Sequence, residues 1–214
     1  MNRFFLLLAM VVMALPAAAM SPAGSYDEEL YGRNKRQVTV KPQFEVNAGF
    51  ITGGKLETKN LGKVKTNLSR PSLEVVGGVR LGKFVFAGVG TGVQYAYGEC
   101  SLIEIFTDAP DSWGMVTIPI YANVRGYVPT RIILKPYVSV CIGGQVVATS
   151  NFSQEGYGKI NGGIMMKFGA GLNISKFNFA MGMAAQNIEW VDEWGDTNFK
   201  AGNHAFYIEA GVTF

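Results

Sequence analysis

The sequence has little charge for its length and contains only two cysteines and one histidine. Charged residues make up 16% of the 214 positions and hydrophobic residues 48%, with a formal net charge of +3. This composition excludes an intrinsically disordered chain, which would be rich in charge and poor in apolar residues. There is also no basic cluster of the kind that binds nucleic acid, so we expect no nucleic-acid partner. A chain of this length and composition folds, and a single domain is the default.

The sequence lacks an apolar run long enough for a transmembrane helix. Its longest run, residues 4–15, follows the basic Arg3 and precedes Pro16 and three alanines. A basic start, about a dozen apolar residues and a small-residue cleavage site form a secretory signal peptide, since a spanning helix needs ~20 apolar residues. We therefore predict that residues 1–19 are removed on export. Residues 20–37 are polar and of mixed charge, and they are predicted to form an N-terminal arm.

Helical periodicity is absent after the arm, and a period of two replaces it. In residues 38–52, Phe44 and Val46 alternate with Glu45 and Asn47, as expected of a strand whose two faces meet different surroundings. Later segments show the same alternation and are rich in β-branched and aromatic residues. We predict eight strands, over residues 38–52, 68–81, 84–98, 115–127, 135–149, 160–174, a segment that begins at Phe177, and residues 203–214.

The connections between the predicted strands alternate between long and short. Long polar stretches follow the first, third, fifth and seventh strands, and short turns follow the second, fourth and sixth. The long stretches are residues 53–67, 99–114, 150–159 and 189–202. An even number of strands with every long connection on one side is typical of an antiparallel barrel that crosses an outer membrane. A soluble sandwich has no reason to segregate its loops by length.

The composition of the second face predicts that the apolar face contacts lipid. In a soluble barrel the face away from the core meets water and carries Lys and Glu, whereas here it is mostly Gly, Asn, Ser, Gln and Thr. Glycine suits the crowded interior of a small barrel. The predicted fold is therefore all-β, an eight-stranded antiparallel up-and-down transmembrane β-barrel over residues 38–214. Aromatic residues near strand ends are predicted to form interfacial girdles, namely Phe50, Tyr95, Tyr97, Trp113, Tyr127, Phe206 and Phe214. Taken singly, each of them could equally be an ordinary core or loop residue.

Two local segments add to this pattern. Residues 206–214 read FYIEAGVTF and end on phenylalanine, and residues 118–125 read IPIYANVR. With the signal peptide and the loop pattern, the chain resembles the small outer-membrane barrels of the OmpA and OmpX type and their porin-family relatives in Gram-negative bacteria. The resemblance implies a C-terminal signal for the barrel-assembly machinery, carried by Phe206, Ile208, Ala210, Val212 and Phe214. Val212 stands where the family has a tyrosine.

The same resemblance implies where the protein resides and what surrounds it. The barrel is expected in the cell outer membrane as a monomer, in contact with membrane lipid and lipopolysaccharide. The arm of residues 20–37 and the C-terminus are expected on the periplasmic side. The four long connections then lie outside the cell, where loops of such scaffolds carry binding.

Six charged residues fall on the predicted inner face, and they nearly balance in sign. Charges inside a barrel must pair to be tolerated, so they are predicted to form a structural ion-pair plug. The alternative is a selectivity or gating element in a narrow pore, because rings of charge set ion preference. The six residues are Glu45, Glu74, Arg80, Arg125, Lys167 and Glu209.

The leading functional hypothesis is a non-catalytic barrel with a structural or surface-interaction role, such as envelope integrity or adhesion. The alternatives are a small porin that passes ions or solutes and a lipid-modifying enzyme. An enzyme of that kind would use a Ser with a His, and the one histidine, His204, lacks the His-x-Ser arrangement. We expect no cofactor and no metal, because the three carboxylates within residues 192–196 do not match an EF-hand loop.

The two cysteines would meet an oxidising compartment after export. Cys100 falls at the end of one predicted strand and Cys141 near the middle of another. Their Cα atoms are then expected to lie beyond the ~7 Å that a disulfide can span, which argues against a bond between them. No cysteine follows the cleavage site to carry a lipid anchor.

Overall fold

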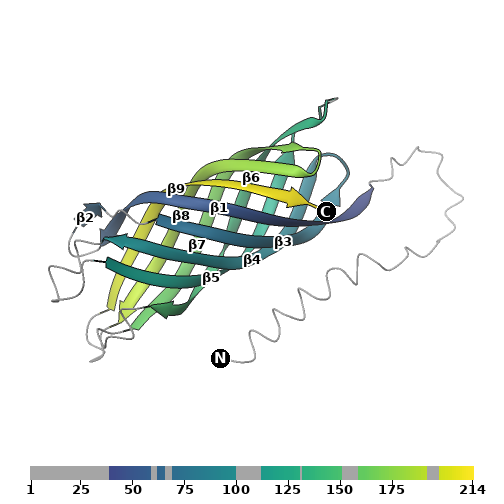
Figure 1. Cartoon of the computed structure of the whole chain (residues 1–214). Coiled ribbons are helices and arrows are strands. Elements are labelled where there is room, and N and C mark those ends of the chain that lie inside the picture. The colour runs from purple at the N-terminus through teal and green to yellow at the C-terminus, as the bar shows by residue number, and fades with distance from the viewer. Residues whose placement is uncertain are drawn as a thin grey trace, which may run out of the picture.

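A computed structural model describes residues 39–58, 62–65, 69–99, 112–130, 132–150, 159–191 and 198–214. Within these ranges the regular structure consists of β-strands (Figure 1). No helix in the described part of the chain is long and apolar enough to cross a membrane. The predicted signal peptide (residues 1–19) and arm (residues 20–37) lie outside the described residues, and both remain predictions.

The strands form one antiparallel sheet that closes on itself. Each barrel strand pairs with the next along the chain, and β1 also pairs with β9, which seals the ring. The short β2 is not one of the strands that close the ring, because it pairs only with the C-terminal end of β1, over residues 55–58. Eight strands therefore form the barrel, which confirms the predicted fold. The strands are β1 (Val40–Thr58), β2 (Gly62–Lys65), β3 (Ser69–Leu81), β4 (Val85–Glu99), β5 (Ser112–Tyr127), β6 (Leu134–Ser150), β7 (Lys159–Ile174), β8 (Phe177–Val191) and β9 (Asn198–Thr213).

Several strands run further into the long connections than the sequence predicts. The first strand continues to Thr58 and returns through β2, although residues 53–67 were predicted to be a loop. The last hairpin is also longer, since the β8–β9 pairing extends to Val191 opposite Asn198. The sequence pattern marks where a strand lies between lipid and the barrel interior. The backbone pairing of the strands continues beyond that zone, where the sequence no longer alternates strictly between apolar and polar residues.

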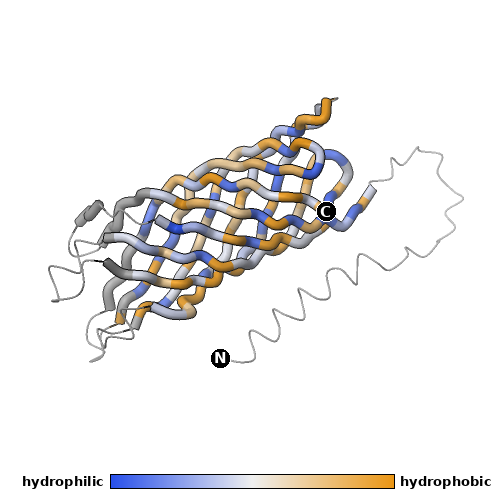
Figure 2. Tube along the Cα trace, in the orientation of Figure 1, coloured by the Kyte–Doolittle hydropathy of each residue, from blue (hydrophilic) through white to orange (hydrophobic). Residues whose placement is uncertain are grey.

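The distribution of apolar and polar side chains in the barrel is the reverse of that in a soluble protein. Large apolar side chains point outward, with Phe44 53%, Ile142 52% and Phe168 63% exposed. Polar side chains such as Asn123 and Gln94 are buried inside. Figure 2 shows hydrophobic and hydrophilic residues alternating along the strands. A closed barrel leaves no unpaired strand edge, so its backbone is satisfied even where the exterior contacts hydrocarbon.

The short turns gather at one rim of the barrel, at the end opposite β2 (Figure 1). The β3–β4 turn places Gly82 at φ 61°, and the β7–β8 turn places Ser175 at φ 56°. Positive φ values of this kind match the twist of tight hairpins. We call this end the short-turn rim and the other end the long-connection rim.

Candidate functional site

The barrel interior holds an ion-paired cluster centred on Lys167. The Nζ of Lys167, on β7, donates to Glu74 Oε1 on β3 at 2.6 Å and to Glu209 Oε1 on β9 at 2.5 Å. The side chains of Lys167 and Glu74 are each 2% exposed. Three barrel strands separate β3 from β7 in either direction around the ring, so this contact crosses the full width of the barrel. Burial strengthens such charge-assisted hydrogen bonds by lowering the local dielectric constant.

A second ion pair lies nearer the short-turn rim. Arg125 on β5 contacts Glu45 on β1 at 2.7 Å, and both side chains are buried. Glu45 also accepts a hydrogen bond from Gln43 Nε2 at 2.7 Å. The guanidinium of Arg125 lies 5.4 Å from the ring centre of Phe86 and 5.1 Å from that of Tyr137. Aromatic faces and a carboxylate together hold this charge inside the barrel.

A chain of hydrogen bonds extends the Lys167 cluster toward the long-connection rim. Arg70 donates to Gln186, the Nε2 of Gln186 donates to Gln94 at 2.9 Å, and the Nε2 of Gln94 donates to Glu74 at 3.1 Å. All three hydrogen bonds are donated in the direction from Arg70 to Glu74. The side-chain amides of Gln186 and Gln94 therefore connect the guanidinium to the carboxylate. Tyr121 also donates to Glu74. Three strands separate β4 from β8 on each side, so the contact between the two glutamines is again a full crossing of the barrel.

Arg70 is the charged residue of this network that is not among the six predicted inner charges, and Gln94, Gln186 and Tyr121 were not predicted as site residues either. The position of Arg70 on β3 follows the same alternation as Ser72 and Glu74, and that alternation is the only signal that marks it as inward-facing. Its hydrogen-bond partner is an amide rather than a carboxylate, so a search for opposite charges does not find it.

Arg80 lies apart from the network. It is half-buried at the short-turn end of β3, and its guanidinium carbon is 4.1 Å from the ring centre of Tyr127. Tyr127 itself is 5% exposed, so its predicted place in a lipid-facing girdle is wrong. Alternation explains this, because Tyr127 shares the inward face of β5 with Arg125. Of the other predicted girdle residues, Tyr95, Tyr97, Phe206 and Phe214 are exposed, Phe50 is half-buried, and the Trp113 side chain lies outside the described residues.

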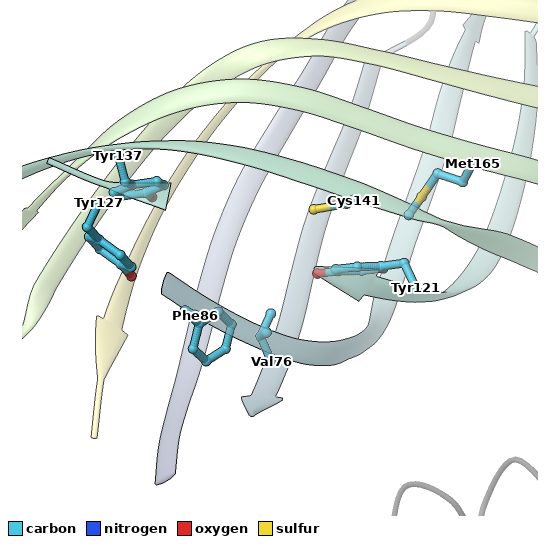
Figure 3. Close-up of a cluster of buried hydrophobic side chains, with 7 residues drawn as sticks. All are labelled: Val76, Phe86, Tyr121, Tyr127, Tyr137, Cys141 and Met165. Atoms are coloured by element: carbon cyan, nitrogen blue, oxygen red, sulfur yellow. The ribbon is translucent and has the colours of Figure 1, made fainter. Parts of the chain in front are cut away.

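Aromatic side chains fill much of the remaining interior. A buried cluster adjoins the polar network through Tyr121, which donates to Glu74. Figure 3 shows its rings directed into the barrel, with Tyr127 beside Tyr137. Glycines on neighbouring strands make room for these rings, since a Cβ at Gly90 would lie 2.4 Å from the Tyr121 ring. The members of the cluster are Val76, Phe86, Tyr121, Tyr127, Tyr137, Cys141 and Met165.

The described cysteine and histidine lie on opposite sides of the barrel wall, since Cys141 is buried and His204 is exposed. Cys141 is a free, buried thiol on β6, whereas Cys100 lies outside the described residues, so the argument against a disulfide remains a prediction. His204 is exposed on the outer surface of β9. Within the part of the chain that the structure describes, no group of three or more His, Cys, Asp or Glu side chains could hold a metal ion. The carboxylates of residues 192–196 lie outside that part.

The residues of the predicted assembly signal lie on β9 and at its end. Phe206, Ile208 and Ala210 are exposed on the lipid-facing side, and Val212 is half-buried. Phe214 is 74% exposed, and its backbone N–H donates to the Phe44 carbonyl of β1 at 2.8 Å. Nothing in this geometry tests the signalling role, which stays a prediction.

No family model matches the sequence, and no characterised protein resembles it significantly in sequence. Among solved structures, it is similar to OprG from Pseudomonas aeruginosa (12% identity, 80% of this chain and 95% of that chain, TM-score 0.42). It is also similar to Neisserial surface protein A (13% identity, 82% of this chain and 99% of that chain, TM-score 0.42). A third similar structure is the outer membrane protein AlkL (12% identity, 88% of this chain and 97% of that chain, TM-score 0.47).

The chain's own structure identifies the class of protein. A closed ring of eight antiparallel strands, an apolar exterior, a polar interior and long connections at one rim are together the architecture of outer-membrane barrels. The chain is an outer-membrane β-barrel protein.

Proposed function

We propose that this outer-membrane barrel has a closed interior and serves as a non-catalytic structural and surface-interaction protein. The observation that carries the proposal is the set of hydrogen bonds that cross the whole width of the barrel. Lys167 joins β7 to β3, and Gln186 joins β8 to Gln94 on β4. An eight-stranded barrel is just wide enough for its side chains to fill, so such crossings block the interior.

The energetics favour a barrel that stays closed. A passing ion would have to separate Lys167 from Glu74 and Glu209, or else Arg125 from Glu45. Breaking one buried pair leaves an uncompensated charge, at a cost of about 3–5 kcal/mol. Several such contacts lie in series along the axis, so the closed arrangement is strongly preferred.

A closed barrel leaves the long connections as the part available to partners. They are attached to a rigid ring at one rim, and loops held in this way commonly carry binding in a scaffold protein. A role in envelope integrity or in adhesion follows from this placement. The proposal assigns no catalytic residue.

Conductance of the purified, refolded full chain in a planar bilayer tests the proposal. We expect an electrically silent membrane, with a mobility shift of the unboiled protein on a gel as the control for folding. Steady, discrete current steps from the folded protein would contradict a closed interior.

A narrow pore is the second candidate, and one specific observation favours it. Several buried polar atoms have no hydrogen-bond partner among the described residues, including Asn47 Oδ1, Asn123 Oδ1 and Gln145 Oε1. Buried polar atoms of this kind are usually satisfied by water. If current steps are seen, neutralising Arg125 or Lys167 is expected to change the ion selectivity, since charged rings set it.

A further inference from the structure

Each of the three short turns has a large exposed apolar side chain in or next to it, together with a lysine in the turn or at the start of the following strand. Lys83 precedes Phe84, and Lys176 precedes Phe177; both phenylalanines are 57% exposed. In the third turn Ile133, 70% exposed, is followed closely by Lys135. The same pair of chemistries therefore recurs around the short-turn rim. Side chains of this kind are typical of a membrane interface, where the apolar group enters the acyl chains and the cation stays among the headgroups.

Charge is distributed asymmetrically between the two rims. Within the described ranges, the glutamates Glu45, Glu74 and Glu209 belong to the interior, and the others lie near the long-connection rim, namely Glu57, Glu99 and Glu189. The short-turn rim thus presents basic side chains and, among the described residues, no aspartate or glutamate. Its cations are Lys41, Arg80, Lys83, Lys135 and Lys176.

The rim cations are available for binding. Lys41, Lys83 and Lys176 are exposed and Lys135 is half-buried, and no described acidic side chain forms an ion pair with any of the four. Arg80 is held in place by the Tyr127 ring, so its guanidinium is already ordered for hydrogen bonding.

The position of these cations determines what they meet. The apolar exterior continues to the short-turn rim through Leu81, Phe84 and Phe177, which are all exposed. Hydrocarbon therefore ends at this level, and the lysines lie in the headgroup layer. We propose that the short-turn rim is a binding surface for anionic phospholipid headgroups, such as phosphatidylglycerol, of the adjoining leaflet.

The expected size of the effect follows from general membrane electrostatics. One Lys or Arg near an anionic surface contributes about 1 kcal/mol, which corresponds to about a five-fold preference. The preference weakens as salt rises, because salt screens exposed charges. The inference is independent of whether the interior conducts, so a failure of either proposal leaves the other standing.

The experiment compares lipids around the refolded full chain. The protein is placed in vesicles of phosphatidylcholine mixed with phosphatidylglycerol, and electron spin resonance of spin-labelled lipids gives the relative association of the two headgroups. We expect a preference for phosphatidylglycerol that falls several-fold in the variant Lys83→Gln/Lys135→Gln/Lys176→Gln. The matched control, Lys55→Gln/Lys63→Gln/Lys65→Gln, removes the same charge at the long-connection rim and is expected to retain the preference.

A second variant keeps the charge and separates binding from folding. Lys83→Arg/Lys135→Arg/Lys176→Arg is expected to retain the preference for phosphatidylglycerol. An unchanged preference in the glutamine variant of the short-turn rim would overturn the inference. An equal loss in the two glutamine variants would also overturn it, because the effect would then follow net charge rather than the rim.

Discussion

Lys167 is a single residue on which two buried carboxylates depend. It donates to Glu74 and Glu209, and neither glutamate forms an ion pair with another described cation. A buried carboxylate without a counter-charge is strongly unfavourable. The interior therefore tolerates the loss of one carboxylate much better than the loss of the shared lysine.

We predict that Lys167→Met lowers the free energy of unfolding by about 3–5 kcal/mol, since it leaves two uncompensated charges inside the barrel. Glu209→Gln is expected to cost less, because Lys167 keeps Glu74 as a partner. Urea unfolding in phosphatidylcholine vesicles measures the free energy of unfolding of both variants. Lys176→Met, at an exposed turn, is the control and should change stability by no more than ~0.5 kcal/mol. Equal midpoints for Lys167→Met and the control would show that the cluster does not stabilise the barrel.

Sequence alternation places individual residues well but does not reveal their partners. It assigns Glu45, Glu74 and Lys167 to the inner face, where the structure also has them. Which of them touch depends on strands far apart in the chain, so no local pattern contains that information. For the same reason the sequence does not predict the hydrogen bond of Arg70 to an amide or the cation–π contact of Arg80 with an aromatic ring.

At the scale of single strands, β9 combines a structural role with a predicted role in recognition. It completes the sheet by pairing with β1 and β8, and its end is predicted to be recognised by the barrel-assembly machinery. The two roles can be tested separately. The side chain of Phe214 is exposed, whereas its backbone N–H donates a hydrogen bond to the Phe44 carbonyl.

We predict that Phe214→Ala reduces the amount of folded barrel in the outer membrane of cells several-fold, because it removes the terminal aromatic of the signal. Refolding of the purified variant in detergent should be nearly unchanged. Phe44→Ala is the matched control, since Phe44 is also an exposed phenylalanine and lies on the paired strand. Quantifying the heat-modifiable band in membrane fractions tests this. A similar loss for both variants would count against a signal at Phe214.

The element boundaries show where a hydropathy pattern stops being informative. All eight barrel strands were predicted, yet β2 and the outer part of β1 were not. The β1–β9 register shifts between Thr52 and Lys55, close to where the predicted first strand ended. A bulge changes which face each later residue occupies, so a strict period of two cannot continue through it.

For the whole molecule, the apolar exterior is the feature that requires a membrane. Arginine on the lipid face of a barrel costs about 2–4 kcal/mol at the membrane midplane and about 0–1 kcal/mol near the interface. Ile142 lies in the middle of β6, and Leu81 lies at the short-turn end of β3; both are exposed.

We therefore predict that Ile142→Arg lowers the free energy of unfolding in vesicles by about 2–4 kcal/mol, and Leu81→Arg by about 1 kcal/mol or less. Reversible urea unfolding measures both values. In detergent micelles, which deform around a charge, the difference between the two variants should shrink. Equal costs at the two depths would contradict a barrel that spans the bilayer along its axis.

The closure of β1 on β9 has a consequence for the order of events during synthesis. The two strands that meet at the seam include Glu45 and Thr213, which are 168 residues apart. Until the last strand has been translated, the sheet has two open edges, and open edges invite pairing with other chains. A stop codon that removes β9 would thus leave the ring open, however much of the rest of the barrel had been made.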